Sequence, residues 1–544
     1  MQASRARSVA LVGALAFAVL AAAAPGPLPS VAAGRVEAHL RVLAADRLAG
    51  RAAGSAGHDE AALYVAGRFR AFGLTPAVGD GYLQPVPLRE ARLQRGSATL
   101  TVRVGGERRR LAWGEDFLMR GDPARRAVEV SAPLVFAGFG VSAPELGHDD
   151  YAGLEVAGKA VLVLSGAPAR FPSNPRAYYS SSDTKRHAAR SRGAVALVTV
   201  ASRTDDGRVP WERRVRHAGR PAMDWLDPGN GAPHAAGTLQ AEARVSHRGA
   251  AELLAGSGRT LDELLARGSA GRAGGFALPA VLQLRARSQH RDLTSPNVLG
   301  VLPGSDPRLR SEHVVVTAHL DAHGTGVAVN GDRIYNGAYD NALGVAILLE
   351  VARTLAEAAE RPRRSLLFAA VTAEEKGLLG AEYLAHHPPV PLASLVANVN
   401  LDMPLFLFPV DEVVAYGAEH STLGEAAAGA FAAAGFALVP DPMPDEVIFV
   451  RSDQYPFVER GIPALYPVPG NRARDPAVDG EAVVRQFLAT HYHMPSDDLA
   501  LPVDWESVAR FTRGVALLVR DVADAAEAPA WKEGDFFAER FARR

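Results

Sequence analysis

The chain has 544 residues, of which 48% are hydrophobic and 22% are charged, and its formal net charge is -1. This length favours two or three domains. The balanced charge argues against nucleic acid as a partner, because the chain has no overall basic field. The lack of cysteine excludes disulfides, thiolate zinc sites and a lipid anchor on an N-terminal cysteine.

The first residues have the pattern of a secretory signal. Arg5 and Arg7 precede an apolar run over residues 9–24, and small residues follow at 31–33. An uncleaved membrane anchor is the alternative, but the run is short for a span of about 20 residues. We therefore expect residues 1–33 to be a signal peptide, and the mature protein to be secreted or periplasmic and free of the membrane.

Two core helices are predicted before residue 118. Apolar residues recur at helical spacing at Val36, Leu40 and Leu43, and again at Ala62, Val65, Phe69 and Phe72. Glycine-bounded apolar runs then predict strands over 133–140, 159–164 and 193–200. The segment 201–236 is predicted to be a loop without a metal site, because His187, His217 and His234 are isolated in the sequence.

From about residue 278, strands and helices alternate. The predicted strands cover 298–302, 313–318, 365–371 and 396–401, and the predicted helices cover 341–358 and 378–384. This alternation predicts an α/β domain with a largely parallel central sheet and helices on both faces.

Candidate metal ligands follow these strands. His319, Glu375 and Asp402 each come just after an apolar strand, Asp340 opens a helix, and His493 lies in a later Tyr-His-x-Pro sequence. Ligands gather at the carboxyl ends of the strands in open α/β sheets. Histidine and carboxylate side chains are also the mixture that zinc accepts.

The spacing of the neighbouring residues suggests their roles. Asp321 is two residues from His319, so on an extended strand it could accept the second imidazole N–H. The adjacent Glu374 and Glu375 repel each other unless a cation is present, so one can bind metal while the other acts as a base. Asp340 could bridge two ions with its two oxygens.

A dinuclear site follows from the combination. His319 and Asp402 would complete one metal, and Glu375 and His493 the other, in either assignment. Two ions about 3.5–4 Å apart can acidify a bridging water, polarise a carbonyl and hold a leaving group. Glu374 would take the proton from that water and deliver it to the leaving amine.

The surrounding motifs carry a family resemblance. They are His-Leu-Asp at 319–321, Asn-Gly-Ala-Tyr-Asp-Asn-Ala at 336–342, Thr-Ala-Glu-Glu-Lys-Gly-Leu-Leu-Gly at 372–380, Asn-Leu-Asp-Met at 400–403, Arg-Ser-Asp-Gln-Tyr-Pro-Phe at 451–457 and Tyr-His-Met-Pro-Ser-Asp-Asp at 492–498. Together they resemble the zinc aminopeptidases of metallopeptidase clan MH, family twenty-eight. The resemblance covers nearly the whole mature chain.

The resemblance implies a site, a fold and an activity. It implies two zinc ions per chain, bridged by Asp340, with Glu374 as the general base and these ligands: His319, Asp340, Glu375, Asp402 and His493. It implies a zinc exopeptidase fold with a mixed sheet, in which residues 34–118 and 276–544 form the peptidase domain. Residues 119–275 would be an inserted, mainly-β protease-associated (PA) domain. The expected activity is the removal of N-terminal residues from peptides or proteins.

Some residues depart from the family pattern. Tyr339, Leu343 and Gln454 stand where an acidic residue, a small serine and a histidine are common, and none is a ligand position. His323 and His491 are expected to be neighbours of the site. The alternatives are a carboxypeptidase of the same fold, for which the sequence shows no assignable arginine patch, a glutaminyl cyclase with one zinc, and a receptor-like relative without ligands. Residue preference and oligomeric state stay open.

Overall fold

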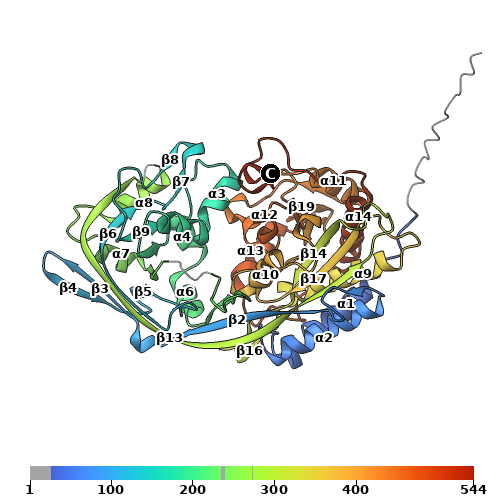
Figure 1. The fold of residues 1–544 in the computed structure, drawn as a ribbon, viewed down its shortest axis with the longest axis horizontal. Helices are drawn as coiled ribbons and strands as arrows, with labels where there is room; N and C mark the ends of the chain where they lie inside the picture. The colour runs from blue at the N-terminus through green and yellow to red at the C-terminus, as the bar shows by residue number, and fades with distance from the viewer. Residues whose placement is uncertain (1–25, 235–238, 272–273, 544) are drawn as a thin grey trace, which may run out of the picture.

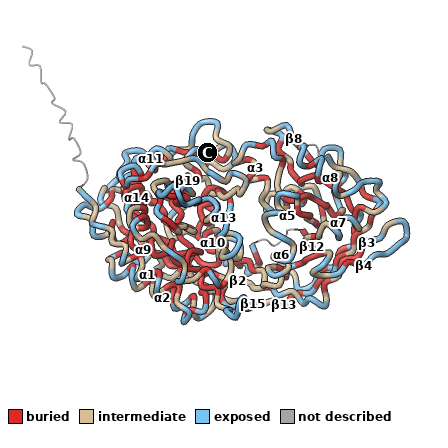
Figure 2. Tube along the Cα trace, turned by 180° about the vertical axis from the view of Figure 1, so that it is seen from behind, coloured by how far each residue is buried: buried red, intermediate tan, exposed pale blue. Residues whose placement is uncertain are grey.

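The computed structural model describes residues 26–234, 239–271 and 274–543 (Figure 1). Most of the predicted signal peptide, residues 1–25, lies outside the described residues. Two bodies lie side by side, and the long strand β13 (Gly275–Leu302) runs through both. Figure 2 shows a separate buried core in each body. Among the described residues, no helix combines the length and the apolar character that crossing a membrane requires.

The large body comprises residues 26–93 and 288–543 and contains a mixed sheet. Its central strands are β14 (His313–His319), β17 (Ser365–Val371), β18 (Leu395–Asn400) and β21 (Ala464–Pro469). β14 pairs in parallel with β17 and β18, and β18 pairs in parallel with β21. The second half of β13 pairs antiparallel with β17, and β19 (Glu412–Tyr416) pairs antiparallel with β21. The predicted mixed, largely parallel sheet is therefore confirmed.

Helices cover both faces of this sheet. Val314 and Val316 pack on one face of β14, against a core that includes α1 (Ala33–Leu43), α2 (Ala56–Ala71), α9 (Leu343–Ala356), α11 (Leu423–Ala433) and α14 (Trp505–Asp524). Val315 points to the other face, toward α10 (Leu379–His386) and α12 (Tyr455–Glu459). Every residue of β14 and β17 is buried, as expected for parallel strands covered on both sides.

The helix α9 is apolar around most of its circumference, which is why it is buried. Its charged residues are Glu350 and Arg353, and Arg353 Nε lies 2.8 Å from Glu350 Oε2. α14 is instead amphipathic, and it begins where Asp504 Oδ1 accepts the backbone N–H of Ser507 at 2.9 Å. The predicted helices over 341–358 and 378–384 are confirmed to within a few residues.

The small body comprises residues 94–287 and has its own sheet. The strands β6 (Ala127–Ala137), β9 (Ala160–Leu164), β10 (Ala196–Val200) and β12 (Ala241–Val245) pair in parallel in this order. The first half of β13 pairs antiparallel with β6 and with β3 (Thr99–Val104). The body also contains the helices α3 (Ser173–Ser180), α4 (Ser182–Arg190), α7 (His247–Leu253) and α8 (Leu261–Ser269).

The packing moves one predicted boundary. Leu100, Leu111 and Phe117 belong to the core of the small body, because β3, β4 (Glu107–Leu111) and β5 (Phe117–Leu118) join its sheet. The predicted first part of the peptidase domain, residues 34–118, is thus shared between the two cores. The division into a peptidase domain and a PA domain stays a prediction.

The predicted loop over 201–236 is wrong. It contains α5 (Arg203–Arg208), α6 (Trp211–Ala218) and β11 (Ala222–Trp225). Ser202 Oγ accepts the backbone N–H of Asp205 at 3.3 Å and so caps the first helix. β11 pairs antiparallel with β2 (Leu83–Leu93), which runs along the large body. This pairing holds the segment where the two bodies meet.

Candidate metal centre

The first group of candidate ligands gathers around His319. This residue ends β14 and is fully buried. Its Nε2 lies 3.2 Å from Asp340 Oδ1 and 3.1 Å from Asp402 Oδ1. The three side chains come from β14, from the start of the α9 region and from the end of β18, and their ligand atoms all lie within 4.8 Å of one another.

The second group shares Asp340 with the first. His493 Nε2 lies 3.2 Å from Asp340 Oδ2 and 3.3 Å from Glu375 Oε2. One oxygen of Asp340 therefore faces each group. The structure brings all five sequence-predicted ligands together at the carboxyl edge of the parallel strands, where the sheet topology directs them.

His323 also lies in the second group. Its Nε2 is 3.1 Å from Glu375 Oε2, and its ligand atom lies within 4.8 Å of those of Glu375 and His493. The sequence prediction treated it only as a neighbour. The alternation of His319, Asp321 and His323 along the chain is the signal that would have found it.

Asp321 has a different role from the predicted one. His319 Nδ1 lies 3.1 Å from the Asp321 backbone carbonyl oxygen, whereas the nearest carboxylate oxygen is 3.9 Å away. The carboxylate instead accepts the backbone N–H of Glu374 at 3.0 Å and that of Glu375 at 3.3 Å. The predicted geometry fails because β14 ends at His319, so Asp321 is not on an extended strand.

Further side chains hold the candidate ligands in place. Asp497 accepts the backbone N–H groups of Tyr339 at 2.9 Å and of Asp340 at 3.0 Å. Ser452 Oγ donates to Asp402 Oδ2 at 2.6 Å. Gln454 is buried and accepts from Asn400 Nδ2 at 3.0 Å, so this departure from the family pattern supports the strand end from behind. Partners of this kind orient metal ligands and tune their basicity.

The other residues singled out in the sequence lie outside the ligand groups. Tyr339 is buried, and its hydroxyl donates to the Pro502 carbonyl oxygen at 2.6 Å. Leu343 is buried at the start of α9. His491 Nδ1 lies 2.9 Å from Ser496 Oγ, in the loop that leads to Asp497.

The centre concentrates buried negative charge. Burial raises the pKa values of Glu374 and Glu375 well above their usual range, and neighbouring carboxylates add to the effect. Burial also acts to raise the pKa of Asp340, but its bonds to His319 and His493 outweigh this and lower it. Asp453 is buried beside them, and neither of its carboxylate oxygens has a hydrogen-bonding partner among the described residues. A divalent cation would offset this repulsion, so the donor set fits a metal.

The small body covers the centre with α6. The ring centroid of His217 lies 5.9 Å from that of His493. Arg213 Nη2 donates to the Tyr492 carbonyl oxygen at 3.0 Å, and the Arg220 guanidinium lies 5.2 Å above the Tyr335 ring. Burial, followed by the charge of Arg220, lowers the pKa of His217 to about 3. The sequence suggested that His217 is isolated, but the structure places it beside the candidate centre.

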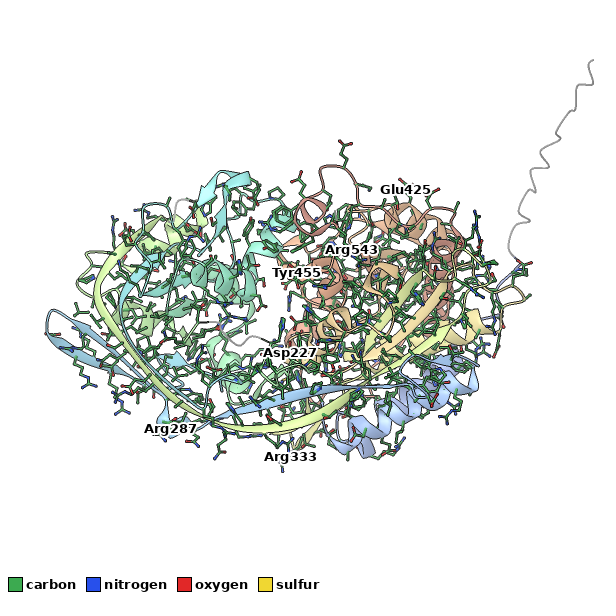
Figure 3. All side chains as sticks on the ribbon, viewed as in Figure 1. Asp227, Arg287, Arg333, Glu425, Tyr455 and Arg543 are labelled. Atoms are coloured by element: carbon green, nitrogen blue, oxygen red, sulfur yellow. The ribbon has the colours of Figure 1, made fainter. Side chains whose placement is uncertain are left out.

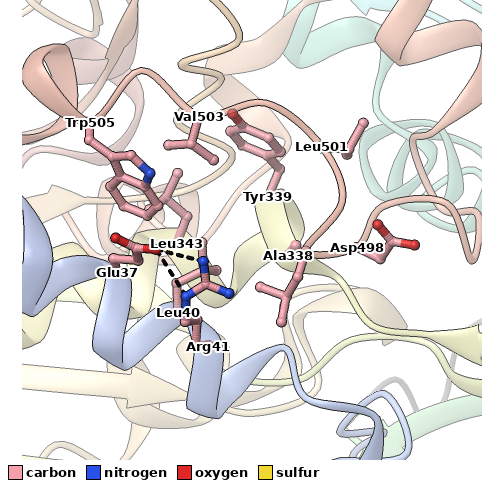
Figure 4. A pocket seen from close by; sticks show the side chains of 11 residues that line it. Glu37, Leu40, Arg41, Ala338, Tyr339, Leu343, Asp498, Leu501, Val503 and Trp505 are labelled. Carbon is pink, nitrogen blue, oxygen red and sulfur yellow. Dashed lines mark hydrogen bonds and ion pairs between the residues drawn. The ribbon is translucent and has the colours of Figure 1, made fainter.

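Two pockets adjoin these residues. A small one is lined by residues of the second group and their neighbours, including His323, Tyr335, Asp340, Glu375 and His493. A larger one lies behind Tyr339, between α1 and the loop that leads to Trp505 (Figure 4). Its lining residues include the ion pair of Arg41 with Glu37, at 2.6 Å, but no histidine. The small pocket is therefore the one that adjoins the candidate metal centre.

A largely parallel sheet that gathers two histidine–carboxylate groups at its carboxyl edge has the architecture of a metallopeptidase. Residues 297–519 match the model of peptidase family M28. An aminopeptidase from Aneurinibacillus sp. strain AM-1 has the same fold, with a TM-score of 0.52 at 19% identity over 92% of this chain and 95% of that one.

Curated relatives match shorter segments. A probable zinc metalloprotease of Pyrenophora tritici-repentis is 42% identical over 94 residues, which are 17% of this chain and 18% of that protein. Aminopeptidase NAALADL1 of Mus musculus is 30% identical over 139 residues, which are 24% of this chain and 17% of that protein. The chain thus matches less than a fifth of the length of these two relatives.

Proposed function

We propose that the protein is an exported dinuclear zinc aminopeptidase, which removes N-terminal residues from peptides. The observation that carries this proposal is the position of Asp340, whose two oxygens each face a separate histidine–carboxylate group. The zinc metalloprotease and aminopeptidase names of the relatives support it. Export rests on the signal pattern of residues 1–33.

The proposed ligand sets follow from the two groups. His319, Asp340 and Asp402 would hold one ion, and Asp340, Glu375 and His493 the other, with His323 beside the second. Nitrogen and carboxylate oxygen donors are those that zinc prefers. Bound zinc would supply an acidified water and polarise the substrate carbonyl.

Glu374 is the proposed general base. It belongs to neither ligand group, whereas its neighbour Glu375 does. Its side chain is 14% exposed, against 4% for Glu375, so it can reach a substrate more readily. Its raised pKa, caused first by burial, suits a group that takes a proton from water and returns it to the leaving amine. Asp321 positions Glu374 through the backbone and does not touch the substrate.

Peptide substrates test this proposal directly. The zinc-loaded protein should hydrolyse aminoacyl-p-nitroanilides and peptides with free N-termini, and it should leave N-blocked peptides intact. Glu374→Gln should lower kcat by about 10²–10⁴-fold while zinc content stays unchanged. Glu375→Gln is the matched variant and should lose zinc. The reverse pattern would mean that the two glutamates have exchanged roles. Cyclisation of N-terminal glutamine peptides would identify a glutaminyl cyclase, and zinc binding without turnover would identify a receptor-like relative.

One observation favours a carboxypeptidase as the second candidate. The sequence shows no assignable arginine patch, but Arg213 and Arg220 of the small body lie beside the centre, and Lys376 follows Glu375. Guanidinium groups bind carboxylates well, so these side chains could hold a substrate C-terminus. Amidation of the peptide C-terminus separates the two activities. It would abolish cleavage by a carboxypeptidase and leave cleavage by an aminopeptidase unchanged.

A further inference from the structure

A second cluster of metal-ligand side chains lies outside the centre. His234, Glu382 and His386 each offer one ligand atom, and these atoms all lie within 4.8 Å of one another. His234 Nε2 is 3.2 Å from Glu382 Oε1, and the ring centroids of His234 and His386 are 5.1 Å apart. The cluster shares no residue with either group of the candidate centre.

The cluster joins the two bodies. Glu382 and His386 are one helical turn apart on α10 of the large body, so their side chains share a face. His234 comes from the small body, from the turn that follows β11. Figure 3 labels Asp227 of the same turn, near the place where the two bodies meet. Asp227 N–H donates to the Ala232 carbonyl oxygen at 2.8 Å and closes this turn.

Trp225 positions two of the three side chains. Its Nε1 donates to Glu382 Oε2 at 3.0 Å, which leaves Oε1 directed at His234. Its ring stacks on the His234 ring with centroids 4.2 Å apart and 15° between the planes. Its carbonyl oxygen accepts the His234 backbone N–H at 2.9 Å. Hydrogen bonds to the far oxygen of a ligating carboxylate are typical of metal sites.

An ion pair explains only part of this arrangement. His234 Nε2 and Glu382 Oε1 are partners in this ion pair, at 3.2 Å. His386 makes no side-chain hydrogen bond with another described residue, although its ring faces theirs. A third ligand to a shared ion accounts for its position.

We propose that His234, Glu382 and His386 bind a divalent transition metal, such as zinc, that links the small body to α10. Two imidazoles and one carboxylate are a known zinc donor set and leave one position for water. The side chains of His234 and Glu382 are 37% and 26% exposed, so an ion can enter from solvent. Because α10 follows the Glu374–Glu375 loop directly, the ion would fix the small body beside the candidate centre.

Zinc stoichiometry of the full chain tests the proposal. Equilibrium dialysis against zinc with elemental analysis should find one more equivalent in the wild type than in His386→Ala or His234→Ala. His387→Ala is the matched control, because its ring also packs against Trp225, at 5.5 Å, but lies outside the cluster. It should bind as much zinc as the wild type. Equal zinc content in the wild type, His386→Ala and His234→Ala would overturn the proposal. Because the test compares the zinc content of the variants with that of the wild type, its result does not depend on whether the candidate centre itself binds zinc.

Thermal unfolding gives an independent readout. His234 is exposed, so His234→Ala should fold even if His386→Ala does not. Added zinc should raise the Tm of the wild type and of His387→Ala more than that of His234→Ala, because one bound ion is missing. An identical zinc-induced rise in all three proteins would contradict the proposed link.

Discussion

Asp321 Oδ1 accepts the backbone N–H of Glu374 at 3.0 Å, across 53 positions of the sequence. The other oxygen of Asp321 accepts the N–H of Glu375 at 3.3 Å. One buried side chain thus fixes the backbone of both the proposed base and a proposed ligand. Its carboxylate bonds to their backbone N–H groups and not to their side chains.

Asp321→Asn should impair the centre without unfolding the protein. Asparagine has a single carbonyl oxygen, so one of the two N–H groups loses its acceptor. We expect kcat and zinc affinity to fall by about 10–100-fold, as for other partners that orient metal ligands. Steady-state kinetics and zinc titration measure both. Asp498→Asn is the control, because the Asp498 side chain accepts the backbone N–H of Ala500 and no other hydrogen bond from the described residues. Unchanged kinetics in Asp321→Asn would contradict the assigned role.

Removal of zinc should inactivate and destabilise the protein. The buried carboxylates of the centre would then face one another without a cation. We expect dialysis against a chelator to abolish turnover and lower the Tm, and added zinc to restore both. Zinc at 100 times its Kd should stabilise the fold by about 2.7 kcal/mol per site.

Scanning calorimetry of Asp340→Asn is the companion experiment. This change removes the charge that faces both ligand groups. The zinc-dependent part of the Tm should shrink strongly. If the variant gains as much stability from zinc as the wild type, Asp340 does not serve as the shared ligand.

Gly380→Ala should displace the loop that carries the glutamates. A Cβ at this position would collide with the Thr372 carbonyl oxygen and lie 2.6 Å from Asn297 Oδ1. Because the Thr372 contact is backbone at the end of β17, we expect a loss of about 1–3 kcal/mol in unfolding free energy and a lower kcat.

A helical glycine provides the control for this change. Gly429 lies in α11, and a Cβ there would have nothing within 4 Å. Gly429→Ala should therefore stabilise the protein by about 0.4–1 kcal/mol. Denaturant titrations measure both variants. A Gly380→Ala protein as stable as the wild type would show that the loop accommodates the added Cβ without a loss of stability.

Stability should fall in mild acid because of His58. This residue is fully buried, and burial together with the charge of Arg51 lowers its pKa from 6.5 to about 3. Between these two values the unfolded chain binds a proton that the native state does not. The free energy of unfolding therefore rises with pH in this window, and His58 contributes up to about 1.4 kcal/mol per pH unit to this rise. The contribution of His58 is lost as the pH falls from 6.5 to 3.

His58→Gln should flatten this dependence. Denaturant titrations between about pH 4 and pH 6 would measure the slope, since most of the window lies there. The exposed His187 supplies the control substitution, His187→Gln, which should leave the slope of the wild type in place. An equal slope in all three proteins would show that His58 is protonated in the native state.

That the candidate ligands would lie close together was predictable, because each signal is local. His319 and Asp402 directly follow apolar runs that form buried parallel strands, and strand direction alone brings their ends together. The role of Asp321 was not predictable, because it depends on where β14 ends. His217 and His234 belong to a segment that is set against the large body by contacts distant in the sequence, such as its pairing with β2. Such distant pairing leaves no periodicity in the sequence, so these residues read as isolated.

β13 also determines how the two bodies can move. It passes between them as one continuous strand, paired with β3 and β6 up to Arg287 and with β2 from Ser288 onward. Any relative motion must bend this hydrogen-bonded ribbon, since no flexible linker is available there to act as a swivel. The small pocket lined by Glu375 and His493 should therefore open only by elastic flexing of small amplitude, which would admit a slender chain end and exclude a bulky folded surface.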